Sequence, residues 1–116
     1  MTSRSSHEKR TSRRVPLDIT AHARIGNRFV KEPLGDISAG GLYLRTKEPA
    51  KEGIAVTVAL ALPEKDGSKI CTLVGNVVRV DRDQKGKLKG LGISFKGEQM
   101  SKADLDALRG FLSRAA

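Results

Sequence analysis

The short glycine-rich stretch from Gly35 to Gly41 combines residue types that could bind a ligand. Asp36 and Ser38 are two positions apart, so their side chains point to the same face wherever the backbone is extended. Both side chains carry oxygens that accept hydrogen bonds from a base edge or from a backbone N–H. Gly40 and Gly41 can adopt positive φ angles and let a ligand approach the main chain. Taken alone, the same residues are more typical of a capped turn.

A cluster of basic side chains precedes the first apolar segment. Arg10 and Arg14 are four positions apart, and Lys9 and Arg13 lie beside them. A guanidinium group presents a planar fork of N–H donors that suits phosphate oxygens, and its plane stacks on purine rings. Such a run alone is typical of a solvated basic tail. Together with the oxygen-bearing stretch, it offers cations for phosphates and acceptors for base or sugar edges.

The composition indicates one basic domain. The chain has 116 residues, of which 38% are hydrophobic and 30% charged, with a net charge of +9. No apolar run approaches the roughly 18 residues that span a bilayer, and the N-terminus lacks an apolar signal region. We therefore expect a cytoplasmic protein without membrane insertion, and the single cysteine, Cys71, fits a reducing compartment. The charge predicts an anionic partner: nucleic acid, a nucleotide, a lipid head group or an acidic protein.

The apolar residues alternate with polar ones along most of the chain, which predicts strands. The first strand is expected from Val15 to Arg24, and Gly26-Asn27 is typical of a hairpin turn. Further strands are expected at 28–37, 42–44, 54–62, 70–80 and 88–95. Gly90 and Gly92 indicate a bend or bulge in the last of them. Six or seven short strands with glycine-rich turns predict a mainly β protein, a six- to seven-stranded antiparallel barrel.

The end of the chain changes to a helical period. Apolar residues recur on one helical face at Leu105, Leu108, Phe111 and Leu112. Ser101 and Asp104 resemble a capping box in which Asp replaces the usual Glu. We predict a helix over 101–114 that packs on the β body.

The start of the chain has no apolar face. Residues 1–7 are rich in serine, so we expect a disordered tail. Residues 8–116 are expected to form a single domain, with a flexible basic arm at its start. No nucleophile–base pair is present, and His7 and His22 lack partners at metal-ligand spacing, so we expect neither an enzyme nor a metal site.

The order Arg10-x-x-x-Arg14, a hairpin, then Asp36-x-Ser38-x-x-Gly41 resembles the PilZ domain family, whose members bind the bacterial second messenger cyclic di-GMP. The resemblance covers roughly 8–95, and the terminal helix also fits. It implies that both arginines contact the phosphates and stack on or hydrogen-bond to the guanines. It further implies that Asp36 and Ser38 contact a guanine edge and that Gly41 keeps the turn compact.

Three further basic residues are candidates for the site. Lys9 and Arg13 lie beside the paired arginines, and we include both among the nucleotide-binding residues. The segment Gly75-Asn76-Val77-Val78-Arg79 is similar to the family strand that faces the ligand. An arginine at position 79 could stack on a base, or it could be an ordinary outward-facing strand residue.

The implied function is a non-catalytic receptor. Cyclic di-GMP would draw the basic arm onto the barrel and create a surface for a separate effector protein, with the receptor a monomer. One alternative is direct RNA or DNA binding by a small basic barrel, which a content of only four aromatic residues disfavours. Another is a PilZ-like adaptor that binds no nucleotide, which the intact arginine and Asp-x-Ser-x-x-Gly patterns disfavour.

Overall fold

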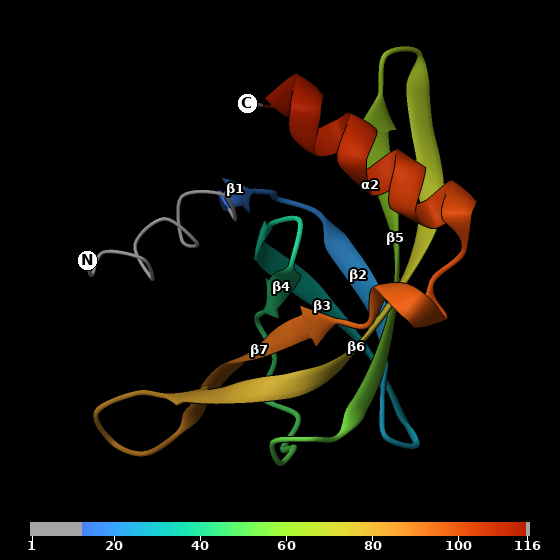
Figure 1. Ribbon diagram of the computed structural model, residues 1–116. Coiled ribbons are helices and arrows are strands. Elements are labelled where there is room, and N and C mark those ends of the chain that lie inside the picture. Colours follow the sequence, from blue (N-terminus) through green and yellow to red (C-terminus); the bar gives the residue numbers. More distant parts are fainter. Residues whose placement is uncertain (1–12, 116) are drawn as a thin grey trace, which may run out of the picture.

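The computed structural model of the chain describes residues 13–115 (Figure 1). Most of these residues lie in seven strands: β1 (Val15–Pro16), β2 (Thr20–Ile25), β3 (Arg28–Ile37), β4 (Gly41–Leu44), β5 (Ala55–Glu64), β6 (Gly67–Arg82) and β7 (Leu88–Phe95). A short 3-10 helix, η1 (Gly97–Gln99), and the α-helix α2 (Lys102–Ala115) follow the last strand.

The six longer strands close into an antiparallel barrel. They pair in the order β3-β2-β5-β6-β7-β4, and β4 pairs again with β3 to complete the ring. The two-residue strand β1 is an extra strand that pairs with β3. The expectation of a six- to seven-stranded antiparallel barrel with a C-terminal helix is confirmed.

The predicted alternation of the strands produces the core. Along β5, Val56, Val58, Leu60 and Leu62 are buried, while the residues between them are partly exposed. Successive side chains of a strand point to opposite faces, so one face of each strand fills the barrel and the other meets solvent. The pairing of neighbouring strands therefore decides which outward side chains lie next to one another.

The expectation of one continuous strand from Val15 to Arg24 is wrong, because the chain breaks into β1 and β2. β1 ends with Pro16 opposite Asp36, and β2 begins with Thr20 opposite Pro33. Pro16 and Thr20 are four positions apart, whereas their partners in β3, at positions 36 and 33, are only three apart. Residues 17–19 lie between the two strands and hold the extra residue, so the regular pairing with β3 is interrupted.

Helix α2 crosses the β5–β6 hairpin (Figure 1) and buries Leu108 and Phe111 against it. The helix begins one residue after Ser101, whose Oγ accepts a 3.0 Å hydrogen bond from the backbone N–H of Asp104. The predicted N-cap and the predicted helix are confirmed. In the described part of the chain, no helix has the length and apolar character needed to cross a membrane.

Candidate functional site

One row of residues crosses four strands on the outer face of the barrel. Asp36 of β3 lies opposite Tyr43 of β4, Tyr43 lies opposite Gly92 of β7, and Gly92 lies opposite Arg79 of β6. Residues that are directly opposite in an antiparallel pair share a face of the sheet. The pairing therefore places a carboxylate, an aromatic ring and a guanidinium in one line.

Arg14 joins this row from the start of the described chain. Its Nε lies 2.7 Å from Oδ1 of Asp36 and donates a hydrogen bond to it. The short strand β1 makes this possible, because its pairing with β3 places Pro16 opposite Asp36. The Arg14 side chain is 48% exposed and that of Asp36 is 31% exposed, so an ion pair here contributes little to stability. Both groups remain accessible to a ligand.

Tyr43 lies at the centre of the row. Its hydroxyl donates a 2.6 Å hydrogen bond to Oδ2 of Asp81, and Cζ of Arg79 lies 5.7 Å from the centroid of its ring, within cation–π range. Burial and the nearby Asp81 raise the pKa of Tyr43 to about 12. The hydrogen bond from Tyr43 lowers the pKa of Asp81. At neutral pH the site therefore holds a neutral phenol, fixed in place, between a carboxylate and a guanidinium.

Two glycines of β7 make room for these side chains. A Cβ atom at Gly90 would lie 2.5 Å from Cζ of Tyr43, and one at Gly92 would lie 3.3 Å from Cβ of Arg79. The bulge expected in this strand is present beside Gly90. Asp81 pairs with Gly90 and Arg82 with Leu88, so β7 carries one more residue than β6 at this point.

Two shallow pockets adjoin the row, and Asp36, Tyr43 and Arg79 line both of them. The first has a volume of about 300 Å³ and extends toward Arg14. The second has a volume of about 400 Å³ and its further lining residues are Gly35, Arg45, Asp81 and Lys89. Together the pockets hold four basic and two acidic side chains, so the site favours an anion. Within residues 13–115, no three His, Cys, Asp or Glu side chains gather to hold a metal ion.

Ser38 and Gly41 hold the turn between β3 and β4. Ser38 follows the end of β3 and is 1% exposed, so it does not share the outer face with Asp36. Its Oγ accepts a hydrogen bond from the Gly40 N–H and donates one to the carbonyl of Gly41, both at 3.3 Å. In the described structure the Ser38 hydroxyl is thus committed to the turn.

Gly40 and Gly41 do not use the positive φ angles that glycine allows. Neither residue has a positive φ. Gly41 is needed for a different reason, because a Cβ atom there would overlap the carbonyl oxygen of Ile93 in the paired strand β7. The glycine therefore lets β4 and β7 approach closely.

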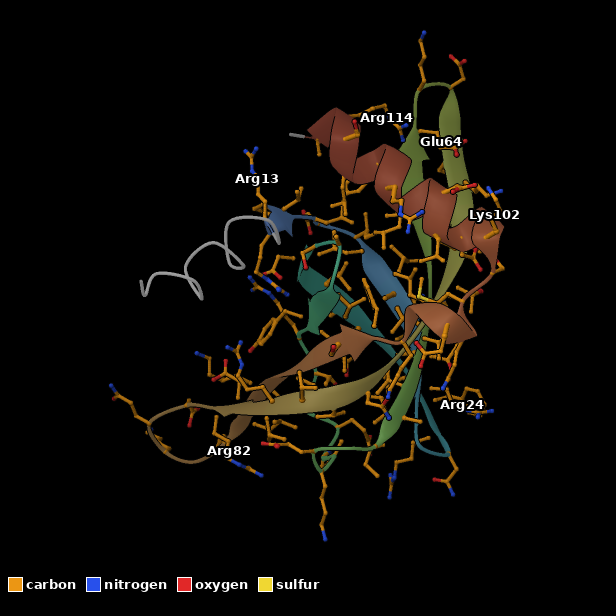
Figure 2. All side chains as sticks on the ribbon, viewed as in Figure 1. Arg13, Arg24, Glu64, Arg82, Lys102 and Arg114 are labelled. Carbon is orange, nitrogen blue, oxygen red and sulfur yellow. The ribbon has the colours of Figure 1, made fainter. Side chains whose placement is uncertain are left out.

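The remaining predicted site residues fall into two groups. Arg13 is exposed and points away from the barrel (Figure 2). Lys9 and Arg10 lie outside the described residues, as do residues 1–7, for which we expected a disordered tail.

Four polar or charged lining residues were missed in the sequence analysis: Tyr43, Arg45, Asp81 and Lys89. Two of them could have been found from the sequence. The alternation over residues 42–45 places Tyr43 and Arg45 on the outer face.

Comparison with known proteins supports one family. The sequence model of the PilZ domain family matches residues 8–114. The Bacillus subtilis inhibitor of motility (MotI/DgrA) aligns with a TM-score of 0.71 and 16% identity, over 87% of this chain and 48% of that one. The PilZ domain of Escherichia coli YcgR, solved with c-di-GMP, aligns with a TM-score of 0.63 and 16% identity, over 90% of this chain and 88% of that one.

These two structures show the shared fold, and this chain spans about half the length of the Bacillus subtilis protein. No curated protein sequence matches the chain. The family match extends over nearly the whole sequence, from the basic arm to the last turns of α2. The chain therefore belongs to the PilZ domain family, whose members are typically non-catalytic receptors for cyclic di-GMP.

Proposed function

We propose that this protein binds cyclic di-GMP on the outer face of the barrel, in the two pockets that share Tyr43 and Arg79. The observation that carries the proposal is the 2.7 Å contact between Arg14 and Asp36. It joins the end of the basic arm to the start of the glycine-rich turn, so the two halves of the sequence pattern meet at one place. Family membership and the c-di-GMP-bound YcgR domain support the same ligand.

The charges and shape of the site suit this ligand. Cyclic di-GMP carries two phosphate charges and two guanines, and the four basic groups of the pockets exceed their carboxylates by two. Guanidinium groups bind phosphate oxygens through paired N–H donors and also stack on aromatic planes. Tyr43 and Arg79 line both pockets, and each pocket offers space for a base.

Each side chain then has a role. Arg14 contacts a phosphate, and Asp36 accepts hydrogen bonds from the N–H groups of a guanine edge. Arg79 stacks on a base, and Arg10 of the arm supplies a second guanidinium, with Lys9 and Arg13 adding positive charge. The turn residues Ser38 and Gly41 act by fixing the position of Asp36.

The output is a change of surface. Ligand phosphates neutralise the basic arm and hold it against the barrel, and a separate effector protein recognises the surface that results. The receptor acts as a monomer and catalyses no reaction. Charge-assisted hydrogen bonds contribute roughly 1.5–3 kcal/mol each, so three or four of them offset the cost of ordering the arm.

Isothermal titration calorimetry tests the proposal. Cyclic di-GMP is titrated into the wild type, Arg14→Ala and Arg109→Ala, with GTP and a short oligonucleotide as competing ligands. Arg109 is a matched control, because it is an exposed arginine of α2 whose nearest carboxylate, on Asp106, lies 4.0 Å away. We expect saturable binding that Arg14→Ala weakens at least tenfold, or about 1.4 kcal/mol, and that Arg109→Ala leaves unchanged.

The same titrations can refute the proposal. An absence of heat with cyclic di-GMP up to about 100 μM would exclude the receptor function. A dissociation constant at this limit corresponds to a binding free energy of roughly −5.5 kcal/mol. Tighter binding of the oligonucleotide, with a steep dependence on salt, would instead favour a nucleic-acid-binding barrel.

A further inference from the structure

Phe29 lies on the surface at the start of β3, far along the strand from Asp36. Its side chain is 80% exposed, the highest value among the large hydrophobic residues that the structure leaves exposed. Burying a phenylalanine gains roughly 1.5–3 kcal/mol, and the folded domain forgoes this gain at position 29. A surface that binds a partner gains this free energy when the ring is buried in the complex.

A pocket of about 430 Å³ adjoins this ring. Its lining comes from β2, β3 and β5 and includes His22, Ala23, Arg24, Val30, Thr57 and Ala59. Aliphatic and small side chains form most of this lining, with basic groups among them. The pocket is therefore suited to an apolar side chain that has acidic neighbours.

The strand pairing arranges the surrounding side chains in two rows. Phe29, Arg24 and Thr57 form one row, and Lys31, His22 and Ala59 form the next. All six share the outer face of the sheet, because each lies directly opposite its neighbour. The rows contain two permanent cations and one histidine but no carboxylate.

Two carboxylates near these rows, on Glu32 and Glu48, have polar partners. Glu32, which follows Lys31, accepts a 2.9 Å hydrogen bond from Oγ1 of Thr46. Arg28, which precedes Phe29, has its Nε 3.1 Å from Oε2 of Glu48. The surface around Phe29 thus presents positive charge beside an exposed ring.

We propose that this surface, defined by Phe29, Arg24, Lys31, His22, Thr57 and Ala59, docks an acidic segment of a partner protein. Carboxylates of the segment contact the two cations, and an apolar side chain enters the pocket beside Phe29. Aromatic residues and arginines are the side chains that most often dominate protein interfaces, and charge complementarity gives the selectivity.

The local geometry favours a protein segment over other anions. Nucleic acid needs a track of cations and several stacking rings, whereas these rows hold one phenyl ring, one imidazole and two permanent cations. A lipid surface is flat, whereas the site is a pocket. The surface also lies apart from the proposed nucleotide site: in Figure 2, Arg24 is on the opposite side of the barrel from Arg13 and Arg82.

Nuclear magnetic resonance of the full chain tests the proposal. The ¹⁵N-labelled protein is titrated with an eight-residue peptide of Glu and Asp residues around a central Leu pair. The comparison peptide has Lys at every acidic position. We expect saturable shifts with the acidic peptide alone, confined to amides of β2, of the first half of β3 and of β5.

Variants then assign the contacts. Phe29→Ala and Arg24→Glu are each expected to weaken binding of the acidic peptide about tenfold. Ile70→Ala and Arg82→Glu are matched controls, since Ile70 is 66% exposed and neither residue lines the pocket. Phe29 and Arg24 are both exposed, so these variants stay folded and their spectra report it.

Several results would overturn the proposal. These are no saturation with the acidic peptide, equal binding of the lysine peptide, or shifts centred on Tyr43. Shifts at this surface on dilution of the protein alone would assign it to self-association, and binding of anionic vesicles or an oligonucleotide in place of the peptide would assign it to those partners. Arg24→Glu must leave cyclic di-GMP binding intact, so the two proposals fail separately.

Discussion

Oδ1 of Asp36 lies 2.7 Å from Nε of Arg14, although 22 positions separate the two residues in the sequence. The same Asp36 lies opposite Tyr43 in the pairing of β3 with β4. One carboxylate therefore connects the end of the basic arm to the row of side chains that crosses four strands. Asp36 thus holds Arg14 beside the pocket that both residues line.

The pKa of Tyr43 offers a test of the site geometry. Tyr43 is the only tyrosine and the chain has no tryptophan, so ultraviolet absorbance near 295 nm reports its ionisation alone. We expect a midpoint of about 12 in the folded protein, above the ordinary value of 10.0, because burial and Asp81 favour the neutral phenol. The neutral phenol therefore stabilises the fold fully below pH 10, and this contribution is lost as the pH rises through about 12.

Two variants should move this pKa in opposite directions. Asp81→Asn removes a negative charge and should lower the pKa of Tyr43, whereas Arg79→Ala removes a positive charge and should raise it. Circular dichroism over the same pH range verifies that the protein stays folded. An ordinary midpoint near 10 in the folded wild type would contradict the contact between Tyr43 and Asp81.

Gly41→Ala should destabilise the barrel rather than act on the ligand alone. The added methyl group would overlap the carbonyl oxygen of Ile93, and backbone atoms in a paired strand cannot move aside cheaply. We expect a loss of about 2 kcal/mol or more in the free energy of unfolding, measured with urea. Gly97→Ala is the control, because a methyl group there meets nothing within 4 Å. Equal stability of the two variants would show that β4 and β7 do not approach as described.

Leu108→Ala tests whether α2 is part of the core. Leu108 is 2% exposed and packs with the buried residues of the barrel, so its truncation leaves a cavity. We expect a loss of roughly 2–5 kcal/mol in the free energy of unfolding. Arg109→Ala, one position along on the exposed face of the same helix, should change it by less than about 0.5 kcal/mol. If both variants changed the free energy of unfolding equally little, the packing of α2 on the barrel would not contribute to stability.

Most of the fold could be predicted from local patterns. Alternation of apolar residues located the strands, and the spacing of Leu105, Leu108 and Phe111 located the helix. The break between β1 and β2 was not predictable in this way. It arises from a mismatch in pairing with β3, and a period-two pattern carries no information about the partner strand.

The candidate site was predicted only in part, because local patterns do not show which strands pair. Arg14 and Asp36 stand in a recognisable order along the chain, and the structure brings them into contact. Tyr43 and Asp81 are 38 positions apart, and only the pairing of β4, β7 and β6 brings them together. Ser38 could share a face with Asp36 only in extended backbone, but β3 ends at Ile37, as expected, and the chain turns at Ser38.

The most direct test of the central claim is a double-mutant cycle on cyclic di-GMP binding, measured by calorimetry for the wild type, Arg14→Ala, Asp36→Ala and the double variant. The ion pair between these residues is exposed, so none of the variants should lose more than about 1 kcal/mol of folding stability. If both residues serve one site, each single change weakens binding and the double variant loses less than the two single losses combined, with a coupling of about 0.5–3 kcal/mol. Wild-type affinity in both single variants, or strictly additive losses, would contradict a shared binding site.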